Sequence, residues 1–159
     1  DGSYEIDLDA FNPAIRERTR FFLLCSPHNP VGRVFRRDEL SRLAEVCLRR
    51  GLAIVADEIH CELTYSGQRH VPIASLDPEI AERTITLMAP SKTFNLAGLK
   101  CSVAIIPNAV LRAKFIAARV APRDPAGVPR PVEELPRQPP PCVAGPAAVV
   151  QAAPPAHAG

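Results

Sequence analysis

A strand–helix–strand pattern constrains the fold more than any other feature of the sequence. The apolar run RFFLLC (20–25) leads through the turn-rich SPHNPVG into RDELSRLAEVCLRRG, where apolar residues recur at helical spacing up to a capping Gly51. LAIVADEI (52–59) is a second apolar run without alternation, as expected for a strand that is covered on both faces. The sequence therefore predicts a βαβ unit within an α/β fold.

Two further apolar runs extend the predicted sheet. TITLMA (84–89) and CSVAIIP (101–107) are typical of strands, and only 11 residues separate them. A parallel crossover usually needs a dozen residues or more, so we expect the later strand to run antiparallel to the earlier one. Asn108 can cap a final helix whose apolar stripe runs to about Arg119.

The composition changes abruptly after Val120. Residues 121–159 hold 11 of the 18 prolines, among many Ala, Val and Arg residues. Proline is excluded from helix interiors and central strands. We therefore expect residues 1–120 to fold and residues 121–159 to form a disordered tail. An out-of-frame translation of a GC-rich gene would also produce such a change.

Charge, hydropathy and cysteine content exclude several classes of protein. The net charge of +2 comes from interspersed acids and bases, which gives no basic surface for nucleic acid or an anionic membrane. No apolar run approaches the roughly 18 residues of a membrane helix. The five cysteines contain no Cys-x-x-Cys pair and indicate a reducing, cytoplasmic setting. His60 and Cys61 lack spaced partner ligands, so no metal site is predicted.

Polar residues follow three of the predicted strands, at the edge where open α/β sheets bind ligands. Asn29 follows the first strand, Asp57 ends the second, and Ser91 and Lys92 follow the third. Each has an ordinary interpretation: Asn29 with Pro30 suits a turn, Asp57 suits a helix cap or an exposed loop, and Lys92 suits the surface. Their equivalent places on successive strands favour one shared site instead.

Three motifs resemble a known family. NPVG, ADEIH and SKTFNLAGLK, in this order and spacing, are similar to the large-domain core of pyridoxal 5′-phosphate enzymes with the aspartate aminotransferase fold, called fold type I. The most similar subgroup is that of cystathionine β-lyase-like carbon–sulfur lyases, where DEIH and PSKTFN(L/I)AG recur. The resemblance covers about residues 1–119. It implies part of the large domain of that fold, pyridoxal phosphate as cofactor, an amino-acid substrate and a homodimer.

The resemblance also implies a role for each candidate residue. Lys92 forms the Schiff base with the cofactor aldehyde and then removes the substrate Cα proton. Asp57 pairs with the pyridine nitrogen, and Asn29 hydrogen-bonds the 3-oxygen of the ring. His60 stands where many relatives place a tyrosine for the same oxygen. Ser91 helps to hold the phosphate.

Two positions depart from the pattern of many aminotransferases. Where these carry a phosphate-binding serine and an arginine, this sequence has Ala89 and Lys100. Lys100 can neutralise a phosphate but cannot bind it with a bidentate fork. The departures favour the lyase subgroup over ordinary aminotransferases.

The implied reaction is elimination of a thiol from a sulfur amino acid, which gives pyruvate and ammonia, with transamination as the alternative. The glycine-containing phosphate loop of the family, its ring-stacking aromatic residue and its carboxylate-binding arginine are not identifiable in the sequence. We therefore expect an internal fragment of such an enzyme. An inactive remnant or interaction module is the alternative of another class. A fragment would expose apolar sheet surface that the rest of the enzyme covers, so we expect the chain to be poorly soluble.

Overall fold

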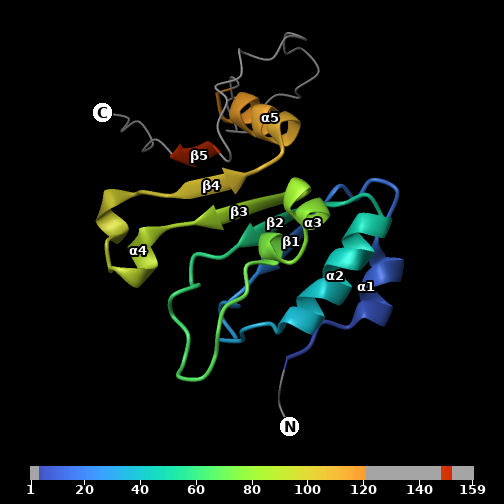
Figure 1. Ribbon diagram of the computed structural model, residues 1–159, viewed down its shortest axis with the longest axis horizontal. Coiled ribbons are helices and arrows are strands. Elements are labelled where there is room, and N and C mark those ends of the chain that lie inside the picture. The colour runs from blue at the N-terminus through green and yellow to red at the C-terminus, as the bar shows by residue number, and fades with distance from the viewer. Residues whose placement is uncertain (1–3, 121–147, 152–159) are drawn as a thin grey trace.

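The computed structural model describes residues 4–120 and 148–151. These residues form one five-stranded sheet with the strand order β1-β2-β3-β4-β5 (Figure 1). The strands are β1 (Phe21–Cys25), β2 (Ala53–Asp57), β3 (Thr84–Met88), β4 (Val103–Ile106) and β5 (Ala148–Gln151). Strands β1 to β3 are parallel, and β4 is antiparallel to both of its neighbours. The predicted α/β class, with a mostly parallel sheet and one antiparallel strand, is confirmed.

Local sequence explains where one of the two longest helices ends and where the other begins. The α-helices are α1 (Leu8–Ala14), α2 (Arg37–Arg49), α3 (Pro78–Glu82), α4 (Pro90–Thr93) and α5 (Ala109–Val120), and two 3₁₀ helices are η1 (Ile73–Ser75) and η2 (Ala97–Leu99). Just after α2, Gly51 adopts a φ of 68°, which glycine tolerates without strain. At the start of α5, the Asn108 Oδ1 accepts the Leu111 N–H at 2.9 Å. Both helices were predicted.

One face of the sheet carries the main core. Leu40, Leu43 and Cys47 of α2 are fully buried against this face, as is Ile54 of β2. Phe11 of α1 packs against the same cluster. Helices α1 and α2 lie together on this side (Figure 1). The amphipathic pattern of α2 therefore predicts its packing correctly.

The opposite face is covered less completely. Leu111 and Phe115 of α5 pack on a smaller cluster that contains Ile85 and Ile106. At the other end of this face, Leu23 of β1 keeps 75% of its surface exposed. The run RFFLLC forms a strand, as the predicted βαβ unit requires, but β1 is buried on one face only, because no described element packs over Leu23.

Strand β5 corrects part of the prediction for the C-terminal segment. Residues 148–151 pair with β4 at the end of the sheet, with Ala148 opposite Ile106 and Gln151 opposite Val103. The four residues AVVQ contain no proline, so their backbone N–H groups can join the ladder. The rest of the expected disordered tail, 121–147 and 152–159, lies outside the described residues, and the boundary after residue 120 remains a prediction. No helix in the described part of the chain is long and apolar enough to cross a membrane.

Candidate functional site

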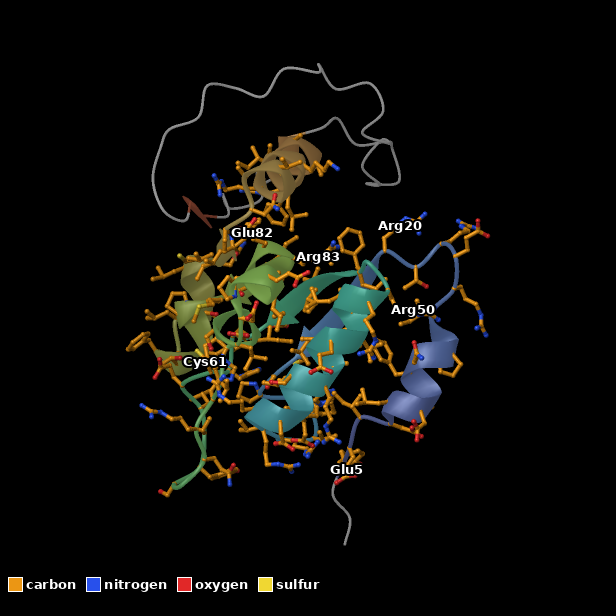
Figure 2. The ribbon with its side chains drawn as sticks, turned by 45° about the vertical axis from the view of Figure 1, so that its right-hand side comes forward. Glu5, Arg20, Arg50, Cys61, Glu82 and Arg83 are labelled. Atoms are coloured by element: carbon orange, nitrogen blue, oxygen red, sulfur yellow. The ribbon has the colours of Figure 1, made fainter. Side chains whose placement is uncertain are left out.

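The three parallel strands end level with one another. Cys25, Asp57 and Leu87 occupy matching positions on β1, β2 and β3. Strands β2 and β3 point toward the edge where α4 lies (Figure 1). In Figure 2, Arg20 and Arg83, which precede β1 and β3, lie away from Cys61, which follows β2. The loops that carry the predicted site residues therefore leave the sheet at its carboxyl edge, as the topology requires.

Asn29 lies in a tight turn after β1. The turn is closed by two backbone hydrogen bonds, in which the His28 N–H donates to the Arg33 carbonyl and the Gly32 N–H donates to the His28 carbonyl, both at 2.7 Å. Gly32 adopts a φ of 69°, a value that favours glycine. Asn29 is exposed. Its side chain is therefore presented at the carboxyl edge on a backbone that is held at both ends.

Asp57 is held on both sides by hydrogen bonds. Its backbone carbonyl accepts the Ser26 N–H at 3.0 Å, which joins the end of β2 to the loop after β1. Its Oδ1 accepts the Ile59 N–H at 3.3 Å, an Asx-type turn that bends the chain away from the strand. The residue is half-buried. The carboxylate thus has a defined direction and one oxygen that remains available to another donor.

A pocket of about 220 Å³ adjoins Asp57 on the face that α5 covers. Its walls come from the ends of β2, β3 and β4 and from α5, and its lining residues are Asp57, Ile59, Leu87, Met88, Ser102, Val103, Ala104, Phe115 and Arg119. The lining is mostly apolar, with one carboxylate and one guanidinium. Of the predicted site residues, only Asp57 lines this pocket.

Ser91 and Lys92 lie on α4, a single turn of helix that begins two residues after β3. The helix is closed by the Phe94 N–H, which donates to the Pro90 carbonyl at 3.0 Å. The Ser91 carbonyl accepts the Leu96 N–H at 2.9 Å and continues the turn. Lys92 is exposed and Ser91 is half-buried. The lysine amine is therefore accessible at the carboxyl edge.

His60 and Cys61 follow Asp57 along the loop after β2. Both are half-buried, and the Nε2 atom of His60 is buried without a hydrogen-bond partner among the described residues. Burial raises the pKa of the Cys61 thiol, and the carboxylates of Glu62 and Glu58 raise it further. Cys61 is therefore protonated at neutral pH and is a poor nucleophile. In the described ranges, no group of three or more His, Cys, Asp or Glu side chains could hold a metal ion.

Lys100 lies apart from the pocket beside Asp57. It is exposed, follows η2, and adopts a φ of 49° in the left-handed region. The fold thus brings Asn29, Asp57, His60, Ser91 and Lys92 to one edge by topology, and adds Lys100 on the link between β3 and β4.

Sequence reasoning missed Phe115 and Arg119 as neighbours of the site. Both come from α5, which was predicted as a helix but without a place over the sheet. Its apolar stripe indicated that it packs on something. Asn108 marks where this helix begins, but local sequence does not determine which strands the helix covers.

Comparison with known proteins identifies the family. The family model described as aminotransferase class I and II matches residues 1–123. The chain belongs to this family. It is 45% identical over 119 residues to the cystathionine β-lyase PatB of Bacillus subtilis, and 37% identical over 110 residues to the aspartate aminotransferase of Geobacillus stearothermophilus. These matches cover 74% and 69% of this chain but 31% and 28% of the two relatives.

A solved structure supports the same assignment. The crystal structure of cystalysin from Treponema denticola, which contains a pyridoxal 5′-phosphate cofactor, matches with a TM-score of 0.70 and 41% sequence identity. The match covers 74% of this chain and 31% of cystalysin. The predicted family and fold are therefore confirmed, and the family is one of enzymes. The chain spans about a third of the length of these relatives, which include both lyases and aminotransferases.

Proposed function

We propose that this chain belongs to a pyridoxal-phosphate-dependent carbon–sulfur β-lyase of the cystathionine β-lyase type. Such an enzyme converts a sulfur amino acid into pyruvate, ammonia and a thiol. The 45% identity to a cystathionine β-lyase carries the proposal. The similarity to cystalysin, a protein that contains pyridoxal phosphate, supports the choice of cofactor.

The residues at the carboxyl edge offer part of the donor set that this cofactor needs. When bound, pyridoxal phosphate supplies an electron-accepting ring that stabilises negative charge at the substrate Cα. The Lys92 amine, exposed just after β3, is accessible to an aldehyde. In its neutral form this amine is also the base that takes the Cα proton.

Asp57, Asn29 and His60 would hold the ring. The Asp57 Oδ1 already accepts the Ile59 N–H, which leaves Oδ2 for a protonated ring nitrogen. The Asn29 amide is a donor for the ring 3-oxygen. The buried Nε2 of His60 lacks a partner among the described residues and is a second candidate for that oxygen.

Ser91 and Lys100 are the proposed phosphate ligands. Ser91 offers a hydroxyl at the first turn of α4, and Lys100 offers a positive charge that neutralises the phosphate without a bidentate fork. We further propose that the intact enzyme is a cytoplasmic homodimer with a small amino-acid substrate. Cys25, Cys47 and Cys61 are free thiols, in keeping with a reducing setting.

Transamination is the second candidate, since the chain is also 37% identical to an aspartate aminotransferase. The two reactions share the proton transfer at Cα and differ in their later steps. A lyase expels a thiolate from Cβ, whereas an aminotransferase passes the amino group on to a keto-acid acceptor.

Reductive trapping tests the proposal. The chain is incubated with pyridoxal phosphate and borohydride, and the modified peptide is identified by mass spectrometry. We expect one adduct, at Lys92. Lys92→Ala should remove this adduct, because the amine that forms it is gone. Lys114→Ala is the matched control and should leave trapping unchanged, because Lys114 lies beside Glu79 and Glu82 in a separate pocket.

Product analysis then separates the candidate functions. Pyruvate released from cystathionine without a keto acid supports the lyase. Amino transfer that requires 2-oxoglutarate supports the aminotransferase instead. Absence of any adduct specific to Lys92 would overturn the proposal for this chain and favour an inactive remnant.

A further inference from the structure

Glu58 is a charged side chain inside the main core. It follows Asp57 directly and is 1% exposed, which makes it the most buried charged residue in the described part of the chain. Glu58 comes directly after β2 and continues the alternation of the strand, so it faces the α2 side while Asp57 faces the α5 side. A carboxylate in an apolar core is costly unless it is hydrogen-bonded. The hydrogen-bond partners of the Glu58 carboxylate therefore indicate its structural role.

Both oxygens of the Glu58 carboxylate are occupied by the far end of the loop after β2. His70 Nε2 lies 3.1 Å from Oε2, and the Ile73 N–H donates to Oε1 at 3.1 Å. The Glu58 backbone N–H donates to the Leu87 carbonyl at 3.0 Å. Glu58 thus joins the end of β2 to β3. It also joins it to His70 and Ile73, which come 12 and 15 residues later in the sequence.

The hydrogen-bonding environment assigns the proton in this pair. The side chain of His70 is 8% exposed, and its Nδ1 atom has no hydrogen-bond partner in the described residues. A proton on Nδ1 would be a buried donor without an acceptor, which is unfavourable. The neutral tautomer with its proton on Nε2 satisfies the geometry, so His70 donates to the Glu58 carboxylate.

The loop between the two partners is held internally by local contacts. Its backbone hydrogen bonds run from the Leu63 N–H to the His60 carbonyl and from the Gln68 N–H to the Tyr65 carbonyl. Tyr65 at its outer part is 85% exposed. Figure 2 shows Cys61 where this loop leaves the sheet, and Figure 1 shows the loop extending away from it. The contacts of Glu58 therefore close the loop at its base.

We propose that Glu58 and His70 form a positioning pair that fixes the direction of the Asp57 carboxylate and the place of His60. Asp57 is the neighbour of Glu58 in the chain, and His60 lies between Glu58 and the anchored end of the loop. If the pair is broken, the chain after Asp57 is free to move, and the hydrogen bond from the Ile59 N–H to Asp57 Oδ1 is lost. The part of the inference that concerns the cofactor rests on the proposed function.

Amide hydrogen exchange at Ile59, measured by NMR, tests the pair without any cofactor. His70→Leu removes the donor and should speed Ile59 exchange by about tenfold more than it speeds exchange at Val55 in the middle of β2. His70→Gln keeps an N–H donor and should restore most of the protection. Glu62→Gln is the matched control, an exposed carboxylate in the same loop, and should change neither amide.

Binding of pyridoxal phosphate gives the second measurement. We expect His70→Leu to weaken binding about tenfold and His70→Gln to recover it, with global stability measured in parallel by denaturant unfolding. If His70→Leu speeds exchange equally at Ile59 and Val55, or leaves Ile59 within about twofold of the parent chain, the pair has only a packing role and the inference is wrong. If the parent chain traps no cofactor at Lys92, the proposed function fails, but the exchange result still decides the positioning role.

Discussion

The two faces of the sheet differ sharply in how far the chain covers them. Leu23 and Leu24 are neighbours in β1, yet Leu23 is 75% exposed on one face and Leu24 is 3% exposed on the other. The α2 face holds the larger cluster of buried side chains, and the α5 face holds a smaller one around Ile85 and Ile106. Most of the hydrophobic stabilisation therefore comes from the α2 face, while the other face presents the pocket beside Asp57.

The largest effect should come from truncating each of the two leucines in turn. Leu24→Ala leaves a cavity in a packed core and should lower the free energy of unfolding by about 2–5 kcal/mol. Leu23→Ala removes a side chain that is already mostly in water and should change it by less than about 0.5 kcal/mol. Denaturant unfolding of both variants measures the two values. Equal losses would show that β1 is covered on both faces in solution.

A smaller effect is expected at the start of α2, the helix that covers the core face. Glu39 forms an ion pair with Arg33, and its Oε2 accepts the Arg36 N–H at 2.8 Å. Burial alone would raise the pKa of Glu39, but the Arg36 N–H and the Arg33 guanidinium outweigh it, so the pKa is lowered. The ionised carboxylate therefore stabilises the first turn of α2.

This lowered pKa fixes the pH dependence. The folded-state pKa lies below the unfolded value of about 4.3, so the stabilisation is present above that pH and is lost as the pH falls through the folded-state pKa. Glu39→Gln should lower the free energy of unfolding by about 1 kcal/mol at pH 7, and the difference should disappear in acid. Glu45→Gln is an exposed control on the same helix and should lower the free energy of unfolding much less. A difference for Glu39→Gln that does not shrink as the pH falls below about 4.3 would contradict this account.

The sequence predicted the strands and the main helix because their signals are local. The apolar spacing in α2, Gly51 after it and Asn108 before α5 each act within a few residues. The short link between β3 and β4 was enough to predict their antiparallel pairing. Strand β5 was not predictable, because its pairing with β4 joins residues about 45 positions apart and prolines surround it.

The site was only partly predictable, for a related reason. Asp57, Asn29 and Lys92 could be assigned to one edge because each ends or follows a strand. The burial of Glu58 was hidden, since two adjacent carboxylates look alike in sequence and only the alternation of the strand sends them to opposite faces. Its partner His70 is 12 residues away, in a loop whose return to the sheet carries no local signal.

The smallest effect on stability, and the clearest consequence for solubility, should come from replacing Leu23 with a charged residue. Phe21 and Leu23 expose 54% and 75% of their surfaces on one face of a strand at the end of the described sheet. Apolar side chains on an unpaired edge favour association between copies of the chain, and a lysine there opposes it. Leu23→Lys should therefore change the free energy of unfolding by less than about 0.5 kcal/mol but reduce self-association, measured by light scattering across a concentration series.

Leu63→Lys is the matched control, because Leu63 is 52% exposed in the loop after β2 and not on the sheet. The same substitution there adds the same charge, so any gain from net charge alone appears in both variants. A parent chain that is monodisperse at every concentration would contradict the predicted poor solubility. Equal improvement in both variants would show that charge, and not the bare face of β1, governs association.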